Sequence, residues 1–377
     1  MSISTKRMSV PFVNIGGQHA AIKAELLEAM GRVIDSGMYV LGAEVEELER
    51  QFAELIGVRF AIGVNSGTDA LIFALRGLGI GPGDEVITAA NSFIASAGCA
   101  AMVGARPVLV DIGDDYNMDP ACFERAITAR TRAVIPVHLT GRPAKMDAIM
   151  RIAEAHKVHV VEDAAQAVTA AYNGTMVGAF GAAGCFSLHP LKTLSAIGDG
   201  GILTTNDEAL YDEVKILRNL GLKTRDDAVV WSGNSRLDTI QAAALLVKLK
   251  YLDEWTEGRR AIARRYRELL ADLPQVRCPG EEPHERAVYQ VFKILADDRD
   301  DLQKYLAEHG IGSAVHYAIP MHLQSVAEEL DYAPGSFPVT ERQAEQILSI
   351  PVYHTLTDEQ VEYVAATIRE FYSGRHL

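Results

Sequence analysis

Residues 59–88 read RFAIGVNSGTDALIFALRGLGIGPGDEVIT, and this stretch decides the fold class. Its first part, Arg59–Val64, is a short apolar run of the kind that forms a buried strand. The turn Asn65-Ser66-Gly67 leads into an expected helix over Thr68–Gly79, and a second turn leads into an expected strand over Glu85–Thr88. A strand, a helix and a strand in this order indicate two parallel strands joined by a crossover helix.

The same alternation continues along the chain. Expected helices at 92–103, 119–128 and 145–156 separate expected strands at 107–111, 132–137 and 158–162. Apolar strands that alternate with helices imply a parallel sheet covered by helices on both faces. Such sheets bind ligands at the carboxyl ends of their strands, so we expect a functional site at that edge.

The regions outside this alternation lead to the prediction of two domains. Helices are expected at 18–36 and 43–57, strands at 184–188 and 201–205, and a long helical stretch over 236–270. The remaining residues mix an expected strand at 288–295 with helices at 298–309, 340–348 and 357–372. We therefore predict a large α/β domain over residues 1–250 and a smaller α+β domain over residues 251–377.

The composition is that of a globular protein, with 377 residues of which 48% are hydrophobic and 23% charged. A net charge of −14 argues against duplex DNA or an anionic membrane surface as a partner. No apolar run reaches ~18 residues, and the first residues lack the apolar core of a signal peptide. The four cysteines form no CxxC pair, which favours free thiols in the cytoplasm. No HExxH motif or carboxylate cluster suggests a metal site.

The most informative stretch for chemistry is AGCFSLHPLKTLSAIGDGGILTT, residues 183–205. Lys192 stands there in a loop between two apolar strands. A lysine held in a dry pocket loses basicity and becomes a nucleophilic amine suited to Schiff-base chemistry. The alternative is a loop lysine that pairs with Asp199.

Two further elements point to a phosphorylated ring as ligand. Asp163 is expected at the carboxyl end of a buried strand, where an acid can hold a cationic ring nitrogen, as in pyridoxal phosphate (PLP) enzymes. Helix N-capping by Asp163 is an alternative that is compatible with this role. The segment Asn65–Asp69 opens a helix after a strand, so its N–H groups and the Thr68 hydroxyl can bind phosphate. Ser187 can add a second hydroxyl, although such residues also form ordinary helix caps.

The order of phosphate site, ring-nitrogen acid and lysine along the chain is that expected of an aspartate-aminotransferase-like PLP enzyme. More specifically, the sequence resembles the DegT/StrS family of PLP-dependent nucleotide-sugar aminotransferases from about residue 10 to residue 372. The most specific of the eight matching segments are EDAAQA and CFSLHPLKTLSAIGDGG. The resemblance implies a fold-type-I PLP aminotransferase, whose large domain contains a mostly parallel, seven-stranded sheet flanked by helices.

The resemblance also implies roles for individual residues. Lys192 would form the Schiff base with the coenzyme and shuttle the proton to and from the substrate carbon. Asp163 would pair with the protonated pyridine nitrogen, and Gln166 would hydrogen-bond the phenolic oxygen. Phe93 would stack on the ring, its alternative being an ordinary residue of a helix core. The phosphate would be held by Gly67, Thr68 and Ser187, and by Asn234 of the neighbouring subunit, which implies a homodimer with shared active sites.

Four residues are candidates for binding the substrates. Arg236 can hold an anionic group, either the carboxylate of glutamate or the phosphate of a sugar nucleotide, or can form a surface salt bridge. His189 stands where similar enzymes often have an aromatic residue facing the sugar, and can act as an acid, a base, a hydroxyl ligand or a packing substitute. The segment HYAIPMHLQ, residues 316–324, places Tyr317 and His322 at the entrance for the sugar by the same resemblance.

We therefore predict a PLP-dependent transaminase that moves an amino group from glutamate, through PLP and its amine form PMP, to a nucleotide-linked keto sugar. The HYxxPxHLQ segment is similar to members that act at C3, which favours a dTDP-linked 3-keto-6-deoxy sugar and a role in amino-sugar or polysaccharide biosynthesis. Amination at C4 and a UDP-linked N-acetyl sugar remain alternatives. A non-catalytic regulatory protein that binds PLP is a third, whereas Lys192 argues against the related dehydratases, which have histidine there.

Overall fold

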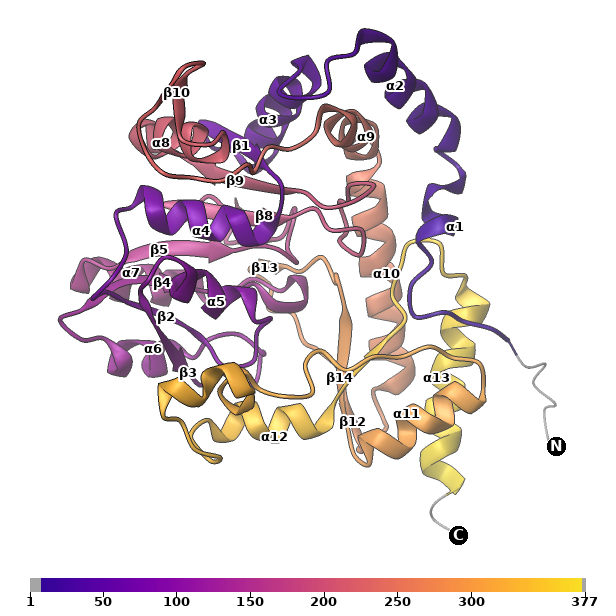
Figure 1. The fold of residues 1–377 in the computed structure, drawn as a ribbon. Helices are drawn as coiled ribbons and strands as arrows, with labels where there is room; N and C mark the ends of the chain where they lie inside the picture. The colour runs from indigo at the N-terminus through magenta and orange to yellow at the C-terminus, as the bar shows by residue number, and fades with distance from the viewer. Residues whose placement is uncertain (1–7, 375–377) are drawn as a thin grey trace.

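A seven-stranded sheet forms the centre of the computed structural model, which describes residues 8–374 (Figure 1). Its spatial order is β1 (Phe60–Val64), β9 (Gly201–Thr205), β8 (Ala183–Ser187), β5 (His159–Asp163), β4 (Thr131–Ile135), β2 (Glu85–Ala89) and β3 (Arg106–Val110). Only β9 runs against its neighbours, β1 and β8, and the other paired strands are parallel. The prediction of a mostly parallel sheet of seven strands is confirmed.

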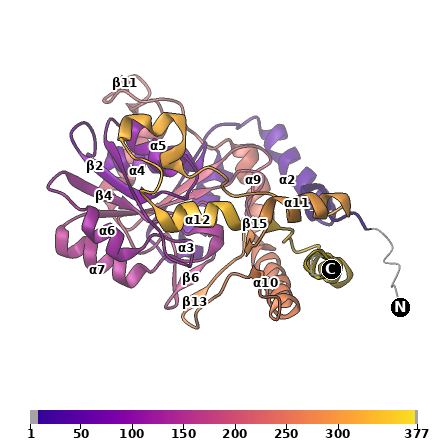
Figure 2. The same cartoon turned by 90° about the horizontal axis from the view of Figure 1, so that it is seen from below.

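Helices cover both faces of this sheet, as the two views show (Figures 1 and 2). One face carries α4 (Gly67–Gly77), α5 (Ala95–Met102) and α8 (Glu208–Arg218), and the other carries α3 (Ala43–Ile56), α6 (Pro120–Ala126) and α7 (Met146–His156). Alternate residues of each strand point to opposite faces. In β1, Ile62 therefore packs into the core beneath α4, and Ala61 packs into the core beneath α3.

The C-terminal part has a hydrophobic core of its own. Helices α10 (Leu252–Leu270), α11 (Arg299–Glu308) and α13 (Asp358–Ser373) surround an antiparallel sheet of β12 (Val276–Arg277), β14 (Phe292–Ala296) and β15 (Ile347–Ile350). Tyr266, Phe292 and Leu348 are fully buried in this core. Val10 joins the same core and pairs with Ile311, so the N-terminal segment packs with the C-terminal part. A domain boundary near residue 250 stays a prediction.

Two of the expected helices are divided. The expected helix 18–36 consists of α1 (Ile15–Ala20) and α2 (Lys23–Ser36), and the expected helical stretch 236–270 consists of α9 (Thr239–Leu249) and α10. At the second break, the N–H groups of Lys250 and Tyr251 bond to carbonyls three residues back, which tightens the turn. At the same point the Tyr251 hydroxyl bonds to Glu25 in α2.

The C-terminal part also corrects one strand prediction and one helix prediction. The strand expected at 288–295 begins only at Phe292, because Tyr289 has a φ of +48° and leaves strand geometry. The helix expected at 340–348 is α12 (Pro338–Gln346), and the apolar run after it forms β15, which the sequence analysis missed. This run pairs with β14 from Phe292↔Ile350 to Leu295↔Ile347, a long-range pairing that overrides the local helical pattern.

Short elements connect these parts. The remaining strands are β6 (Ala171–Tyr172), β7 (Thr175–Met176), β10 (Leu222–Thr224), β11 (Asp227–Ala228) and β13 (Glu285–Arg286), and the 3₁₀ turns are η1 (Leu139–Gly141), η2 (Met321–Leu323) and η3 (Ser325–Leu330). No helix within residues 8–374 combines the length and the apolar character needed to span a membrane.

Candidate active site

A cavity of about 440 Å³ opens at the carboxyl ends of the central strands. Asp163 ends β5, Ser187 ends β8, and the loop after β8 carries Lys192. Nine of the residues that the sequence analysis singled out line this cavity: Gly67, Thr68, Phe93, Asp163, Gln166, Ser187, His189, Lys192 and Tyr317. The chain thus gathers them from segments that are as much as 250 residues apart, 317 − 67 = 250.

Lys192 is partly buried in the lining of this cavity. Burial lowers its pKa below the ordinary value of 10.5, and the negative charge of Asp163 opposes that shift. Asp199 lines the same cavity, but within residues 8–374 the structure shows no ion pair between Asp199 and Lys192. The lowered pKa favours the neutral, nucleophilic form of this amine.

Asp163 is buried and held by two donors. The Ser96 hydroxyl donates to its Oδ2 at 2.6 Å, and the backbone N–H of Ala165 donates to its Oδ1 at 3.2 Å. The Ser96 hydroxyl also lies 2.8 Å from that of Ser92, four residues earlier and before the start of α5. These bonds orient the carboxylate, which the cavity leaves open to one further cationic or donor group. The sequence analysis missed Ser96. The only signal in the sequence was its spacing of four residues from Ser92 within the expected helix 92–103.

The N-terminus of α4 forms a cradle beside Ser187. The Ser66 hydroxyl caps the helix by accepting a bond from the Asp69 N–H at 3.1 Å. A Cβ atom placed on Gly67 would lie 2.8 Å from the Cβ of Ser187, so the two backbones approach too closely for any other residue there. The positive end of the helix dipole and its free N–H groups make such a cradle suited to a phosphate group.

Gln166 and Phe93 form the walls between the cradle and the C-terminal part. The side-chain oxygen of Gln166 accepts a bond from the Thr140 N–H at 2.7 Å, and its amide nitrogen lies 3.5 Å from the Tyr317 hydroxyl. Phe93 is 54% exposed, which excludes the alternative of an ordinary core residue. Its ring centre lies 5.7 Å from that of Tyr317, and burial raises the pKa of Tyr317 to about 12.

Three predicted site residues lie outside the cavity lining. The Arg236 guanidinium donates to the side-chain oxygen of Asn219 at 3.0 Å, and Asn234 forms a backbone bridge to the same residue. His322 is buried, and its Nε2 lies 3.0 Å from Glu341. Within one chain, the structure therefore does not bring these side chains to Lys192, and their substrate and phosphate contacts stay predictions.

Two residues that were not singled out also line the cavity. His316 contributes an imidazole whose Nδ1 lies 3.0 Å from the Ser349 hydroxyl, and Gln290 reaches in from the segment before β14. Burial, with the charges of Lys293 and Lys192, lowers the pKa of His316 to about 4, which keeps its ring neutral. His316 belongs to the quoted HYAIPMHLQ segment, whereas nothing local in the sequence marks Gln290.

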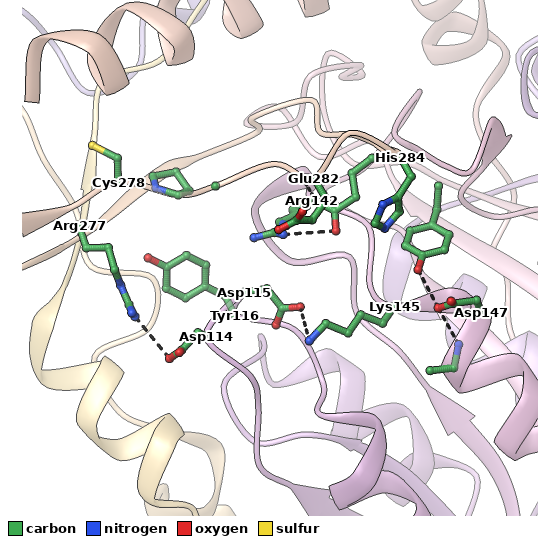
Figure 3. Close-up of a pocket in the computed structure, with 15 residues that line it drawn as sticks. Asp114, Asp115, Tyr116, Arg142, Lys145, Asp147, Arg277, Cys278, Glu282 and His284 are labelled. Atoms are coloured by element: carbon green, nitrogen blue, oxygen red, sulfur yellow. Dashed lines mark hydrogen bonds and ion pairs between the residues drawn. The ribbon is translucent and has the colours of Figure 1, made fainter. Parts of the chain in front are cut away.

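A second hollow, of about 630 Å³, is lined by Tyr116 and by several charged side chains (Figure 3). Its charged side chains point toward one another, and most of them form pairs. Lys145 lies 3.2 Å from Asp115, and Arg142 lies 2.8 Å from Glu285. Among residues 8–374, no group of three His, Cys, Asp or Glu side chains is arranged to hold a metal ion.

Comparison with known proteins identifies the family. Residues 20–369 match the profile of the DegT/DnrJ/EryC1/StrS aminotransferase family. The chain belongs to this family. The predicted family, fold type and transaminase class are therefore confirmed, and the cavity around Lys192 is the candidate active site of a DegT/DnrJ/EryC1/StrS aminotransferase.

Relatives within the family carry different names. The chain is 43% identical to a pleiotropic regulatory protein of Geobacillus stearothermophilus. The match covers 98% of this chain and 100% of that protein. It is 41% identical to dTDP-3-amino-3,4,6-trideoxy-α-D-glucose transaminase of Streptomyces venezuelae, with 98% of both chains covered. It is also 41% identical to UDP-N-acetyl-3-dehydro-α-D-glucosamine 3-aminotransferase of Acidithiobacillus ferrooxidans. That match covers 98% of this chain and 100% of that protein.

Solved structures agree with the fold and with the coenzyme. DesV of S. venezuelae, in complex with a ketimine intermediate, superposes with a TM-score of 0.94 at 42% identity over 96% of this chain and 98% of that one. NtdA of Bacillus subtilis, with bound PMP, superposes with a TM-score of 0.91 at 28% identity, and the match covers 97% of this chain and 86% of that one. The buried amine, the anchored carboxylate and the cradle that a Cβ at Gly67 would fill are the groups that PLP needs, so the residues present fit this coenzyme.

Proposed function

We propose that this chain is a PLP-dependent aminotransferase that converts a nucleotide-linked keto sugar into an amino sugar. One observation carries this proposal: the buried amine of Lys192 and the anchored carboxylate of Asp163 share a cavity with the N-terminus of α4. When bound, PLP supplies the electron sink that lets an amino group pass from an amino acid to a carbonyl carbon. The resemblance of the chain favours glutamate as the amino donor.

The residues of the chain divide the work. Lys192 would hold the coenzyme before reaction, and its amine would then move a proton at the substrate carbon. Asp163, fixed by Ser96, would hold the positive ring nitrogen, and Gln166 would donate to the phenolic oxygen. The half-exposed ring of Phe93 would pack against the coenzyme and exclude water from one side.

For the acceptor we propose amination at C3. Two relatives that share 41% identity with the chain are named for amination at C3, one with a dTDP sugar and the other with a UDP sugar. The segment that contains Tyr317 carries the same resemblance, and Tyr317 lines the cavity opposite Phe93. We favour a dTDP-linked 3-keto-6-deoxy sugar, with the UDP-linked N-acetyl sugar as the second candidate. A regulatory role is the third candidate function, because the Geobacillus relative is named a regulatory protein.

We further propose a homodimer in which Asn234 completes the phosphate site of the partner subunit. The segment that leads to Asn234 exposes Val229 and, almost entirely, Trp231, whose exposed fraction is 96%. Met38 and Tyr39 are exposed as well, and a backbone bridge joins Val40 to Asp238. Exposed apolar side chains of this size favour an interface between subunits. The four free cysteines support a reducing, cytoplasmic location.

A turnover assay tests the proposal. The purified protein is loaded with PLP and given glutamate with dTDP- and UDP-linked sugars that carry a ketone at C3 or C4. We expect amination of a 3-keto sugar and transfer of the nitrogen from ¹⁵N-labelled glutamate into the product. A protein that binds the coenzyme but aminates no sugar of the panel would instead support the regulatory role.

A further inference from the structure

One side chain holds the part of the loop next to Lys192. The side-chain oxygen of Gln290 accepts bonds from the N–H and from the hydroxyl of Thr193, both at 2.7 Å. Its amide nitrogen donates to the carbonyl oxygen of Leu191 at 2.6 Å. One amide group therefore bonds to the backbone immediately before and immediately after Lys192.

Gln290 is itself fixed by both parts of the molecule. It follows Tyr289, whose positive φ ends the extended run, and the carbonyl groups of both residues lie 3.4 Å from the buried guanidinium of Arg259 in α10. Just before this point, the Val288 N–H bonds to the Gly141 carbonyl at 2.9 Å. The neighbouring Thr140 is the residue that holds Gln166, so both glutamines are anchored to one turn.

We propose that Gln290 is a positioning residue for Lys192, which holds the backbone on both sides of it so that its amine points into the cavity. This inference rests on the proposed transamination. An amide is suited to the task because it offers an acceptor and a donor at once. A reactive group displaced by about 1 Å can lose a factor of about 100 in rate, so a loop without regular structure needs such support.

Substitutions of Gln290 can separate its bonds to Thr193 from its bond to Leu191. Gln290→Met keeps the length of the side chain and removes all three bonds. Gln290→Glu keeps the acceptor for Thr193 and removes the donor for Leu191. Gln241 in α9 provides a matched control, because its amide brackets Ile197 in the same loop, accepting from the N–H at 2.7 Å and donating to the carbonyl at 2.9 Å.

The kinetic expectation is a loss in kcat. We expect Gln290→Met to lower kcat by about 10- to 100-fold while KM changes by less than about threefold, because substrate contacts remain and only the amine moves. Gln290→Glu should lie between this variant and the wild type. Gln241→Met should stay within about threefold of the wild type, because its bonds lie five residues from Lys192, 197 − 192 = 5.

A second readout does not depend on turnover. In the protein without coenzyme, acetic anhydride labels each lysine according to its free amine, and peptide mass spectrometry reports the labelling of Lys192 against pH. The wild type should titrate below pH 10.5, since burial has the largest effect on the amine. The other titratable groups of the cavity are Asp163, Asp199, His189, His316 and Tyr317. In Gln290→Met the curve should shift toward that ordinary value, because a released loop exposes the amine.

The results separate this inference from the proposed function. Unchanged labelling and unchanged kcat in Gln290→Met would overturn the inference, and so would an equal loss in Gln241→Met, which would indicate general loosening of the loop. Should Gln290→Met fail to fold, the comparison of Gln290→Glu with Gln241→Met decides in the same way. If the wild type itself forms no bond between Lys192 and PLP, the proposed function fails instead.

Discussion

The two hollows of the molecule differ in how their charges are balanced. The one that Tyr116 lines contains pairs such as Arg142–Glu285, in which both side chains are largely buried and hydrogen-bonded (Figure 3). The smaller one contains Lys192, whose buried amine has lowered basicity, and Asp163, which is oriented by donors of its own chain. Volume therefore does not mark the candidate active site. Unpaired, pKa-shifted groups in a cavity are the better guide to chemistry.

The largest expected effect sharpens this contrast between the two hollows. Lys192→Ala should reduce turnover by about 10³-fold or more, because it removes the nucleophile and the proton carrier together. Lys145→Ala removes a lysine of the other hollow, where the amine only pairs with Asp115, and should change turnover by less than about twofold. The measurement is initial rate per folded molecule under saturating glutamate. Comparable losses in the two variants would remove the distinction.

A smaller effect is expected at Ser96. Ser96→Ala removes the 2.6 Å bond to Asp163, and we expect about a tenfold loss in turnover because a charge-assisted hydrogen bond of roughly 1.5–3 kcal/mol no longer orients the carboxylate. Ser96→Thr keeps the hydroxyl and should stay close to the wild type. Affinity for PLP, measured by its absorbance on titration, should weaken in the alanine variant alone. Wild-type affinity and rate in Ser96→Ala would show that Asp163 needs no such support.

The smallest effect concerns Lys293, which lies between the two hollows. Its ammonium group is buried 5.0 Å from the centre of the Tyr116 ring, and burial lowers its pKa to about 7. From pH 7 to pH 10.5 the unfolded chain therefore binds more protons at this residue than the folded chain, and the free energy of unfolding rises with pH. Lys293→Met should flatten this rise and raise the free energy of unfolding at pH 7 by about 1–3 kcal/mol.

Urea unfolding at pH 7 and at pH 9.5 measures this effect. Lys145→Met serves as the matched control, because it removes a lysine whose side chain is 45% exposed. Parallel stability curves for the wild type and Lys293→Met would show that Lys293 does not titrate in this range.

Much of the fold and the centre of the site could be predicted because their signals are local. The alternation that begins at residues 59–88 predicts the parallel strands, and the loop of Lys192 stands out for its position between two apolar strands. The failures are long-range. β15 forms because Ile347–Ile350 meets β14, and the helical stretch 236–270 breaks where Tyr251 reaches Glu25.

The supporting residues of the site were missed for the same reason. Ser96 reaches Asp163 across 67 residues of sequence, and Gln290 reaches Thr193 across 97, so no local pattern connects either pair. Conversely, the motif resemblance singled out Asn234, Arg236 and His322, which one chain does not bring to the cavity. A motif indicates which residues a family uses, and it does not indicate from which subunit they act.

The central claim is that Lys192 is the residue that binds the coenzyme. It is tested most directly by incubating the protein with PLP, reducing with borohydride and mapping the labelled peptide by mass spectrometry. We predict a single stoichiometric label on Lys192, with the yellow colour of the protein lost on reduction. A protein that stays colourless, or a label that appears on Lys145 or another lysine while Lys192 stays free, would contradict the account.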